Sequence, residues 1–90
     1  MAIQVHVHKT HQQYTNNQEM VEAEGKNVGE CLDNLIKTYP GLKDALFNKK
    51  GKLHGYVEIY VNRETAYPDE LAKTLKDGDE IHITYMLAGG

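Results

Sequence analysis

The chain has 90 residues, which suits a single domain whose core needs no disulfide staples. Its hydrophobic share of 40% and charged share of 26% are those of an ordinary globular protein. The formal net charge of −3 argues against nucleic acid as the main partner, because phosphate binding requires a clustered basic surface. No apolar run is long enough to span a bilayer, and no secretory signal pattern precedes the first strand. The only cysteine is Cys31, so no internal disulfide can form, and we expect a cytoplasmic protein without a membrane partner.

Two strands are predicted near the N-terminus. Residues 3–8 alternate apolar and polar side chains with the period of two that is typical of a strand with one buried face. A weaker alternation covers residues 20–24. The polar stretch 9–18 is interpreted as a long hairpin loop, with Asn16-Asn17 as its turn signal. These features predict an antiparallel hairpin.

The main helix is predicted to begin after Asn27, which can act as its N-cap, with Glu30 three residues on in a capping-box arrangement. Pro40 and Gly41 end it, because the residue before a proline is disfavoured in the α region. Between these limits one apolar stripe has helical spacing: Val28, Cys31, Leu32, Leu35, Ile36 and Tyr39. On this stripe Cys31 is expected to be a buried, inert thiol rather than a nucleophile.

The second half of the chain contains two more predicted strands. Residues 42–47 suggest a short helical turn that packs under the main helix, and residues 56–61 form the clearest alternating strand of the chain. Residues 63–65 are interpreted as a loop, and Pro68 begins a single helical turn. The tight turn Asp77-Gly78-Asp79 then starts the last strand, residues 81–85.

This order of elements predicts an α+β fold, a β-grasp roll with a mixed sheet of four or five strands and one main helix on one face. The first and last strands are expected to form a central parallel pair, with the main helix in the crossover between them. The expected core comprises Ile3, Val5, Val7, Val28, Leu32, Leu35, Ile36, Leu46, Val57, Ile59, Leu75, Ile81 and Ile83. The domain is expected to span residues 1–86, followed by a flexible tail at 87–90.

The tail ends on Gly89 and Gly90. Because neither residue has a Cβ atom, the tail can pass through a channel that excludes side chains and can deliver the α-carboxylate of Gly90 into another protein's active site. From the dipeptide alone, a frayed terminus is the favoured interpretation, because most chain ends are poorly ordered.

Several segments resemble the ubiquitin-like sulfur carriers, the family of the molybdopterin synthase small subunit and the thiamine-pathway sulfur carrier. They are Val28-Gly29-Glu30-Cys31-Leu32 with Leu35 and Tyr39-Pro40-Gly41, then Tyr60-Val61-Asn62, then Leu75 to Ile81, and finally Gly89-Gly90. Many members carry a proline pair shortly before the glycines, where this chain has Thr84-Tyr85-Met86-Leu87. The resemblance therefore leaves the pathway open.

The resemblance implies a carrier rather than an enzyme. A ubiquitin-activating-like adenylyltransferase would use ATP to adenylate the carboxyl group of Gly90, and a sulfur donor would then displace AMP to give a thiocarboxylate. A sulfur-accepting enzyme would take this sulfur into a cofactor, an amino acid or another sulfur metabolite, and the carrier itself would bind no cofactor. Two alternatives remain: a protein modifier joined through Gly90 to lysines, and a binding module with an idle tail.

The outward-facing strand residues are expected to form a docking face for such partners. They are His6, His8, Tyr56, Glu58, Tyr60, His82 and Thr84. From this face and the tail we expect Tyr56, Tyr60, His82, Leu87 and Ala88 to bind partners. His6, His8 and His82 could together bind zinc. Because no carboxylate or thiol is evidently spaced to complete the set, the interpretation is a solvated face without a metal site.

Overall fold

A computed structural model describes residues 2–85, and Met1 and residues 86–90 lie outside that description. Strands and helices follow in this order, with η marking 3-10 helices: β1 (Ala2–Val7), η1 (Lys9–Tyr14), β2 (Met20–Glu24), α1 (Val28–Thr38), α2 (Leu42–Leu46), β3 (Val57–Val61), β4 (Glu64–Thr65), η2 (Glu70–Ala72) and β5 (Glu80–Tyr85). Among the described residues, no helix has the length and apolar character needed to cross a membrane.

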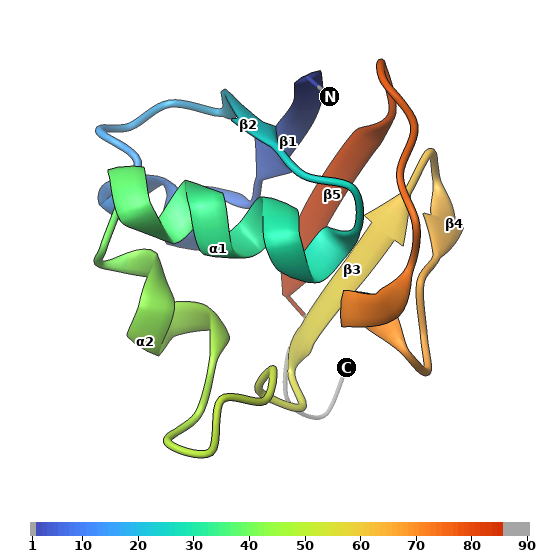
Figure 1. Cartoon of the computed structure of the whole chain (residues 1–90). Coiled ribbons are helices and arrows are strands. Elements are labelled where there is room, and N and C mark those ends of the chain that lie inside the picture. The colour runs from blue at the N-terminus through green and yellow to red at the C-terminus, as the bar shows by residue number, and fades with distance from the viewer. Residues whose placement is uncertain (1, 86–90) are drawn as a thin grey trace.

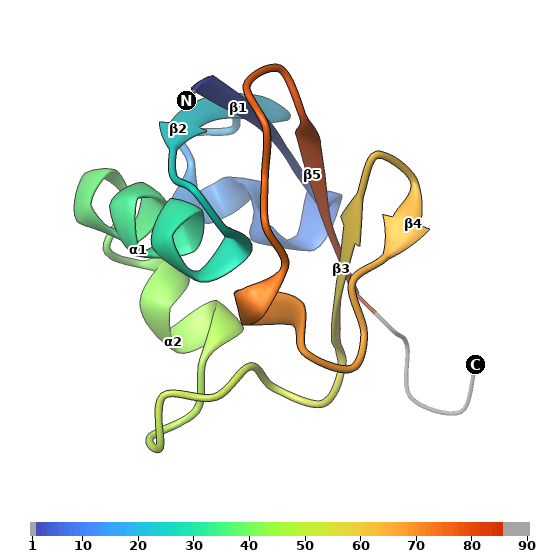
Figure 2. The same cartoon turned by 45° about the vertical axis from the view of Figure 1, so that its right-hand side comes forward.

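The five strands form one sheet in the order β2-β1-β5-β3-β4, drawn in Figure 1. β1 and β5 run parallel in the middle of the sheet, and every other neighbouring pair is antiparallel. Figure 2 shows α1 and α2 on the same side of this sheet. The predicted mixed sheet, its central parallel pair and the helix packed on one face are thus confirmed.

Helix α1 begins at the predicted cap. The backbone N–H of Glu30 donates to Oδ1 of Asn27 at 2.7 Å, which satisfies one of the free donors of the first turn. The Glu30 carboxylate accepts from the N–H of Lys26 at 3.3 Å, one residue earlier than in a standard capping box. At the other end, the Tyr39 N–H donates to the carbonyl oxygen of Leu35 at 2.9 Å and closes the helix.

The core lies between α1, α2 and the sheet face that they cover. All the expected core residues are buried except Ile36, which is only partly buried and packs against the edge of the core. The prediction placed Ile36 too deep in the core, because this residue lies at the margin of the apolar stripe of α1. The core also takes in residues that the expected set omitted: Val21, Ala23, Cys31, Leu42, Val61 and Ala66.

Two segments that were interpreted as loops have regular structure. The stretch after β1 forms η1, which carries the buried His11, and Thr15 directly after it is also buried. Burial lowers the pKa of His11, and the nearby His8 lowers it further. Residues 64–65 form β4, because Asn62 and Arg63 both adopt positive φ and make the two-residue turn of a tight hairpin.

Truncating Leu35 tests the packing of α1. Leu35 is 1% exposed, so Leu35→Ala is expected to lower the free energy of unfolding by about 2–5 kcal/mol through lost contacts and a cavity. Lys37→Ala, at an exposed position of the same helix, provides the matched control and should change it by less than about 0.5 kcal/mol. Urea denaturation measures both, and equal effects would mean that the apolar stripe is assigned to the wrong residues.

Candidate functional site

The tail residues Leu87, Ala88, Gly89 and Gly90 lie outside the described residues, so their predicted roles stay predictions. The structure does describe the element that leads into them. β5 ends at Tyr85 and is held on both sides, by β1 through a parallel ladder and by β3 through an antiparallel one. The last described strand is therefore fixed in the middle of the sheet.

The candidate docking face is the side of the sheet opposite α1. Along β5 the buried Ile81 and Ile83 alternate with outward residues, and β1 and β3 follow the same pattern. The outward set, which we call the outer face, consists of Gln4, His6, Glu58, Tyr60, Glu80, His82 and Thr84. His82 lies between its direct neighbours in the two ladders, His6 on β1 and Tyr60 on β3. Two of the predicted partner-binding residues, Tyr60 and His82, are thus side by side.

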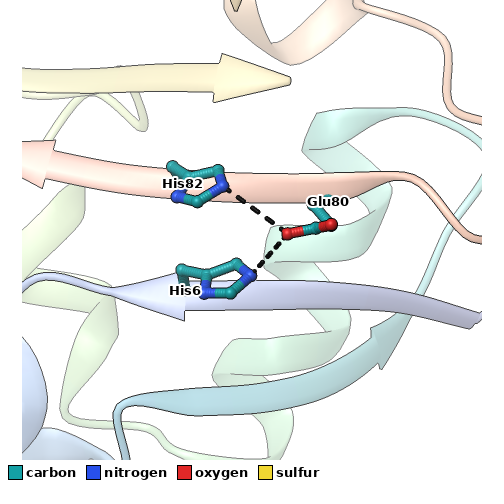
Figure 3. Close-up of side chains that lie close together, drawn as sticks. All are labelled: His6, Glu80 and His82. Atoms are coloured by element: carbon teal, nitrogen blue, oxygen red, sulfur yellow. Dashed lines mark hydrogen bonds and ion pairs between the residues drawn. The ribbon is translucent and has the colours of Figure 1, made fainter. Parts of the chain in front are cut away.

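His6, Glu80 and His82 form a cluster on this face, which Figure 3 shows in close-up. The two imidazole rings stack with centroids 4.2 Å apart and planes within 3°. Oε1 of Glu80 lies 2.8 Å from Nε2 of His6 and 3.7 Å from Nε2 of His82. Burial lowers the pKa of His82 and the adjacent His6 lowers it further, whereas the Glu80 carboxylate acts in the opposite direction.

This cluster corrects the expectation that no carboxylate stands near the histidines. Glu80 belongs to β5 and precedes His82 by two residues, so both side chains leave the same face of the strand. The sequence does contain that signal, but the last strand was predicted to begin only at residue 81. His8 does not join the cluster, because its Nδ1 accepts the Thr10 N–H at 3.2 Å and caps η1.

Tyr60 is tied to its own strand. Its hydroxyl donates to Oε2 of Glu58 at 3.2 Å. This bond and the negative charge of Glu58 raise the pKa of the Tyr60 phenol, because both favour its protonated form. This bond holds the Tyr60 hydroxyl next to Glu58 on the outer face.

Tyr56 does not lie on the outer face, contrary to expectation. β3 begins only at Val57, whose N–H bonds to the carbonyl of His54 at 3.0 Å, so Tyr56 belongs to a turn and does not follow the strand alternation. Its ring stacks on His54 at 4.8 Å and packs against Tyr85 at 4.7 Å between centroids. Together with Tyr14 of η1 it lines a shallow hollow beside α2. Tyr56 and Tyr60 therefore belong to two separate surfaces.

Asn62 connects the end of β3 to the start of β5, an interaction that sequence reasoning missed. Its Nδ2 donates to Oδ1 of Asp79 at 2.9 Å, and its Oδ1 accepts from the N–H of Glu80 at 3.0 Å. The Asn62 amide and the Lys76 N–H, which donates to Oδ2 of Asp79 at 2.8 Å, hold the pKa of Asp79 below its usual value. The two segments around Asn62 and Asp79 that carry the resemblance thus form one physical unit.

Cys31 is the buried thiol that the helical stripe predicts. It is 0% exposed, and burial raises its pKa to about 11. Because the thiolate is the reactive form, this environment makes Cys31 a poor nucleophile at neutral pH.

The comparisons with known proteins agree with this fold. A family model described as the ThiS family matches residues 5–90, so the chain belongs to the ThiS family. The match confirms the resemblance to ubiquitin-like sulfur carriers and the interpretation of the chain as a carrier rather than an enzyme.

Individual relatives include both carriers and modifiers. The chain is 36% identical over 80 residues to the sulfur carrier protein CysO of Mycobacterium bovis, a match that covers 86% of each chain. Its structure resembles CysO in the BexX/CysO complex of Amycolatopsis orientalis, with 31% identity, a TM-score of 0.88 and coverage of 98% and 99%. It also resembles small archaeal modifier protein 1 of Methanosarcina acetivorans, with 26% identity, a TM-score of 0.87 and coverage of 99% and 96%.

A pair of glycine variants tests the Asn62 connection. Asn62 and Arg63 both have positive φ, where glycine is unstrained, but only Asn62 has a side chain bonded to other described residues. Asn62→Gly should lower the free energy of unfolding by about 1–2 kcal/mol through the lost hydrogen bonds. Arg63→Gly should leave it nearly unchanged. Chemical denaturation measures the free energy of unfolding of both variants. Equal losses would show that the hydrogen bonds of Asn62 contribute nothing to stability.

Proposed function

We propose that the protein is a sulfur carrier whose C-terminal Gly90 is adenylated and then converted into a thiocarboxylate. The observation that carries this proposal is the ThiS family match, which extends through residue 90 and so includes both terminal glycines. The relation to CysO of Mycobacterium bovis, named a sulfur carrier protein, supports the same conclusion.

The chemistry needs an external activating enzyme because a carboxylate is a poor acyl donor. An oxygen of the Gly90 carboxylate attacks the α-phosphorus of ATP, and pyrophosphate leaves. Hydrosulfide supplied by a sulfur donor then attacks the acyl carbon, AMP departs with the electron pair of the broken C–O bond, and loss of the S–H proton leaves the thiocarboxylate. The resulting thiocarboxylate carries a nucleophilic sulfur that an accepting enzyme transfers to its substrate. ATP is thus a substrate of the activating partner and is not bound by the carrier.

The described part of the chain supplies recognition. The outer face offers a half-buried tyrosine, Tyr60, and a half-buried histidine, His82, held by neighbouring strands. Aromatic side chains of this kind are enriched among interface anchors. We assign to this face the contact with a ubiquitin-activating-like adenylyltransferase, and to Leu87 and Ala88 a contact with an apolar groove that leads to the nucleotide.

A second function shares the first step. In a protein modifier, the activated Gly90 would form an isopeptide bond with a lysine of another protein instead of receiving sulfur. The likeness to small archaeal modifier protein 1 of Methanosarcina acetivorans favours this alternative. Mass spectrometry of the protein from its own cells separates the two. Replacement of one oxygen by sulfur at the C-terminus identifies the carrier, and chains linked to other proteins identify the modifier.

The tail is tested by two variants with intact cores. Gly89→Ile places a β-branched side chain in the segment that must enter the activating enzyme and narrows its backbone angles. A residue added after Gly90 moves the carboxylate away from the nucleotide. Both variants are expected to abolish ATP–pyrophosphate exchange with the cognate activating enzyme. Their free energy of unfolding should stay that of the parent, because the tail contributes no core residue. Normal exchange by both would refute the carrier and the modifier together.

The outer face is tested by truncating its tyrosine. Tyr60→Ala is expected to weaken binding to the activating enzyme by more than about 1 kcal/mol, as measured by calorimetry. Tyr56→Ala probes the separate hollow beside α2, because Tyr56 was also predicted to bind partners and lies there. If only Tyr56→Ala lowers the affinity, the docking surface is the hollow beside α2 and not the outer face. The unfolding midpoint of each variant checks that the fold is kept.

A further inference from the structure

The outer face carries a chemical feature that the tail chemistry does not use. His6, Glu80 and His82 each present one ligand atom, and these three atoms all lie within 4.8 Å of one another. All three side chains are half-buried and come from β1 and β5. Figure 3 shows both imidazole Nε2 atoms directed toward the same carboxylate.

We propose that His6, Glu80 and His82 form a binding site for a divalent transition metal ion, with zinc as the ion that fits best. Imidazole and carboxylate are both common zinc ligands, and a set of three protein ligands leaves one position open for water or another molecule. This site is independent of the proposed tail chemistry, because it uses no residue beyond β5.

The distances suit a tetrahedral ion. With bonds of about 2.0–2.1 Å, two ligands of such an ion lie about 3.4 Å apart. The observed separations of Oε1 of Glu80 from the two Nε2 atoms, 2.8 Å and 3.7 Å, lie on either side of that value. All three ligand atoms lie within 4.8 Å of one another, and the two imidazole rings, which stack in parallel planes, have to turn out of that stack to direct both Nε2 lone pairs at one ion.

The backbone fixes this arrangement before any ion arrives. His6 and His82 are direct partners in the parallel ladder, so their side chains leave neighbouring strands at the same level. The opposite faces of the same strands hold Val5 and Ile81, both 0% exposed, which anchor the two backbones in the core. A site that rests on paired central strands loses little conformational freedom when it binds.

Binding replaces an existing hydrogen bond. Nε2 of His6 lies 2.8 Å from Oε1 of Glu80, and because an ionised carboxylate can only accept, the Nε2–H of His6 is the donor. An ion requires the lone pair of Nε2 in both rings, so this proton moves to Nδ1 of His6 or to solvent. Glu80 then exchanges a hydrogen bond for a coordination bond, and its charge offsets part of the charge of the ion.

The test is a calorimetric titration of Zn²⁺ into the full chain, free of any affinity tag, in a buffer that does not bind metals. The parent is expected to bind one ion per chain, and Mg²⁺ should not compete, because it prefers a shell of oxygen ligands. His6→Asn and His82→Asn should each weaken Zn²⁺ binding at least about tenfold, and Glu80→Gln should also weaken it. Zn²⁺ should raise the unfolding temperature of the parent but not that of His82→Asn.

His8→Asn is the matched control. His8 lies two residues from His6 in the same chain segment, but it caps η1 and is not part of the cluster. Its replacement should leave Zn²⁺ affinity unchanged. If His8→Asn and His82→Asn weaken Zn²⁺ binding equally, the ion occupies a site of different composition. If the parent binds Zn²⁺ no more tightly than the His6→Asn/His82→Asn double variant, the cluster is an ordinary hydrogen-bonded group. Either result overturns the proposal.

Discussion

The parallel pairing of β1 with β5 is the constraint on which the rest of the structure depends. These strands come from opposite ends of the chain, and their register sets Val5 beside Ile81 and Val7 beside Ile83 on the buried face. Parallel neighbours cannot be joined by a tight turn, so the intervening chain has to cross the sheet, and α1 provides that crossover. Because α1 covers one face of the sheet, the outer face is the side to which we assign recognition, and β5 lies in the middle of the sheet (Figure 1).

A second constraint places β3 against this pair. The two-residue turn after β3 directs Asn62 toward Asp79 and the N–H of Glu80, so the hairpin turn and the turn before β5 are held together. This connection lies at the end of β5 opposite to the tail. By holding β3 to the start of β5, the Asn62 connection helps to keep Tyr60 beside His82. It takes up none of the surface at the other end of β5, which leads to the tail.

The sequence was sufficient where a local pattern coincides with burial. Strict alternation predicted β1, β3 and β5, and Asn27 predicted the start of α1. Prediction failed where tertiary contacts override the local pattern. η1 consists largely of polar residues, and its burial of His11 depends on neighbouring elements. Tyr56 continues the alternation of β3 in the sequence, but in the structure it belongs to the turn that begins at His54 and precedes the strand. Glu80 lies next to His6 only because β1 and β5 pair in one particular register.

The two proposed roles of the outer face meet at His82. The proposed carrier chemistry takes place at the terminus, so the outer face would contribute binding to a partner and the proposed metal site would share that surface. If an ion occupies the cluster, the Nε2 atom of His82 is no longer available to a partner, and the partner instead meets the open coordination position of the ion. A partner with its own metal-binding side chain would then bind more tightly, and a partner without one would lose a hydrogen bond. Under these two proposals, metal occupancy and partner choice would be thermodynamically linked through a single imidazole, and by reciprocity each partner would change the affinity for the ion by the same factor.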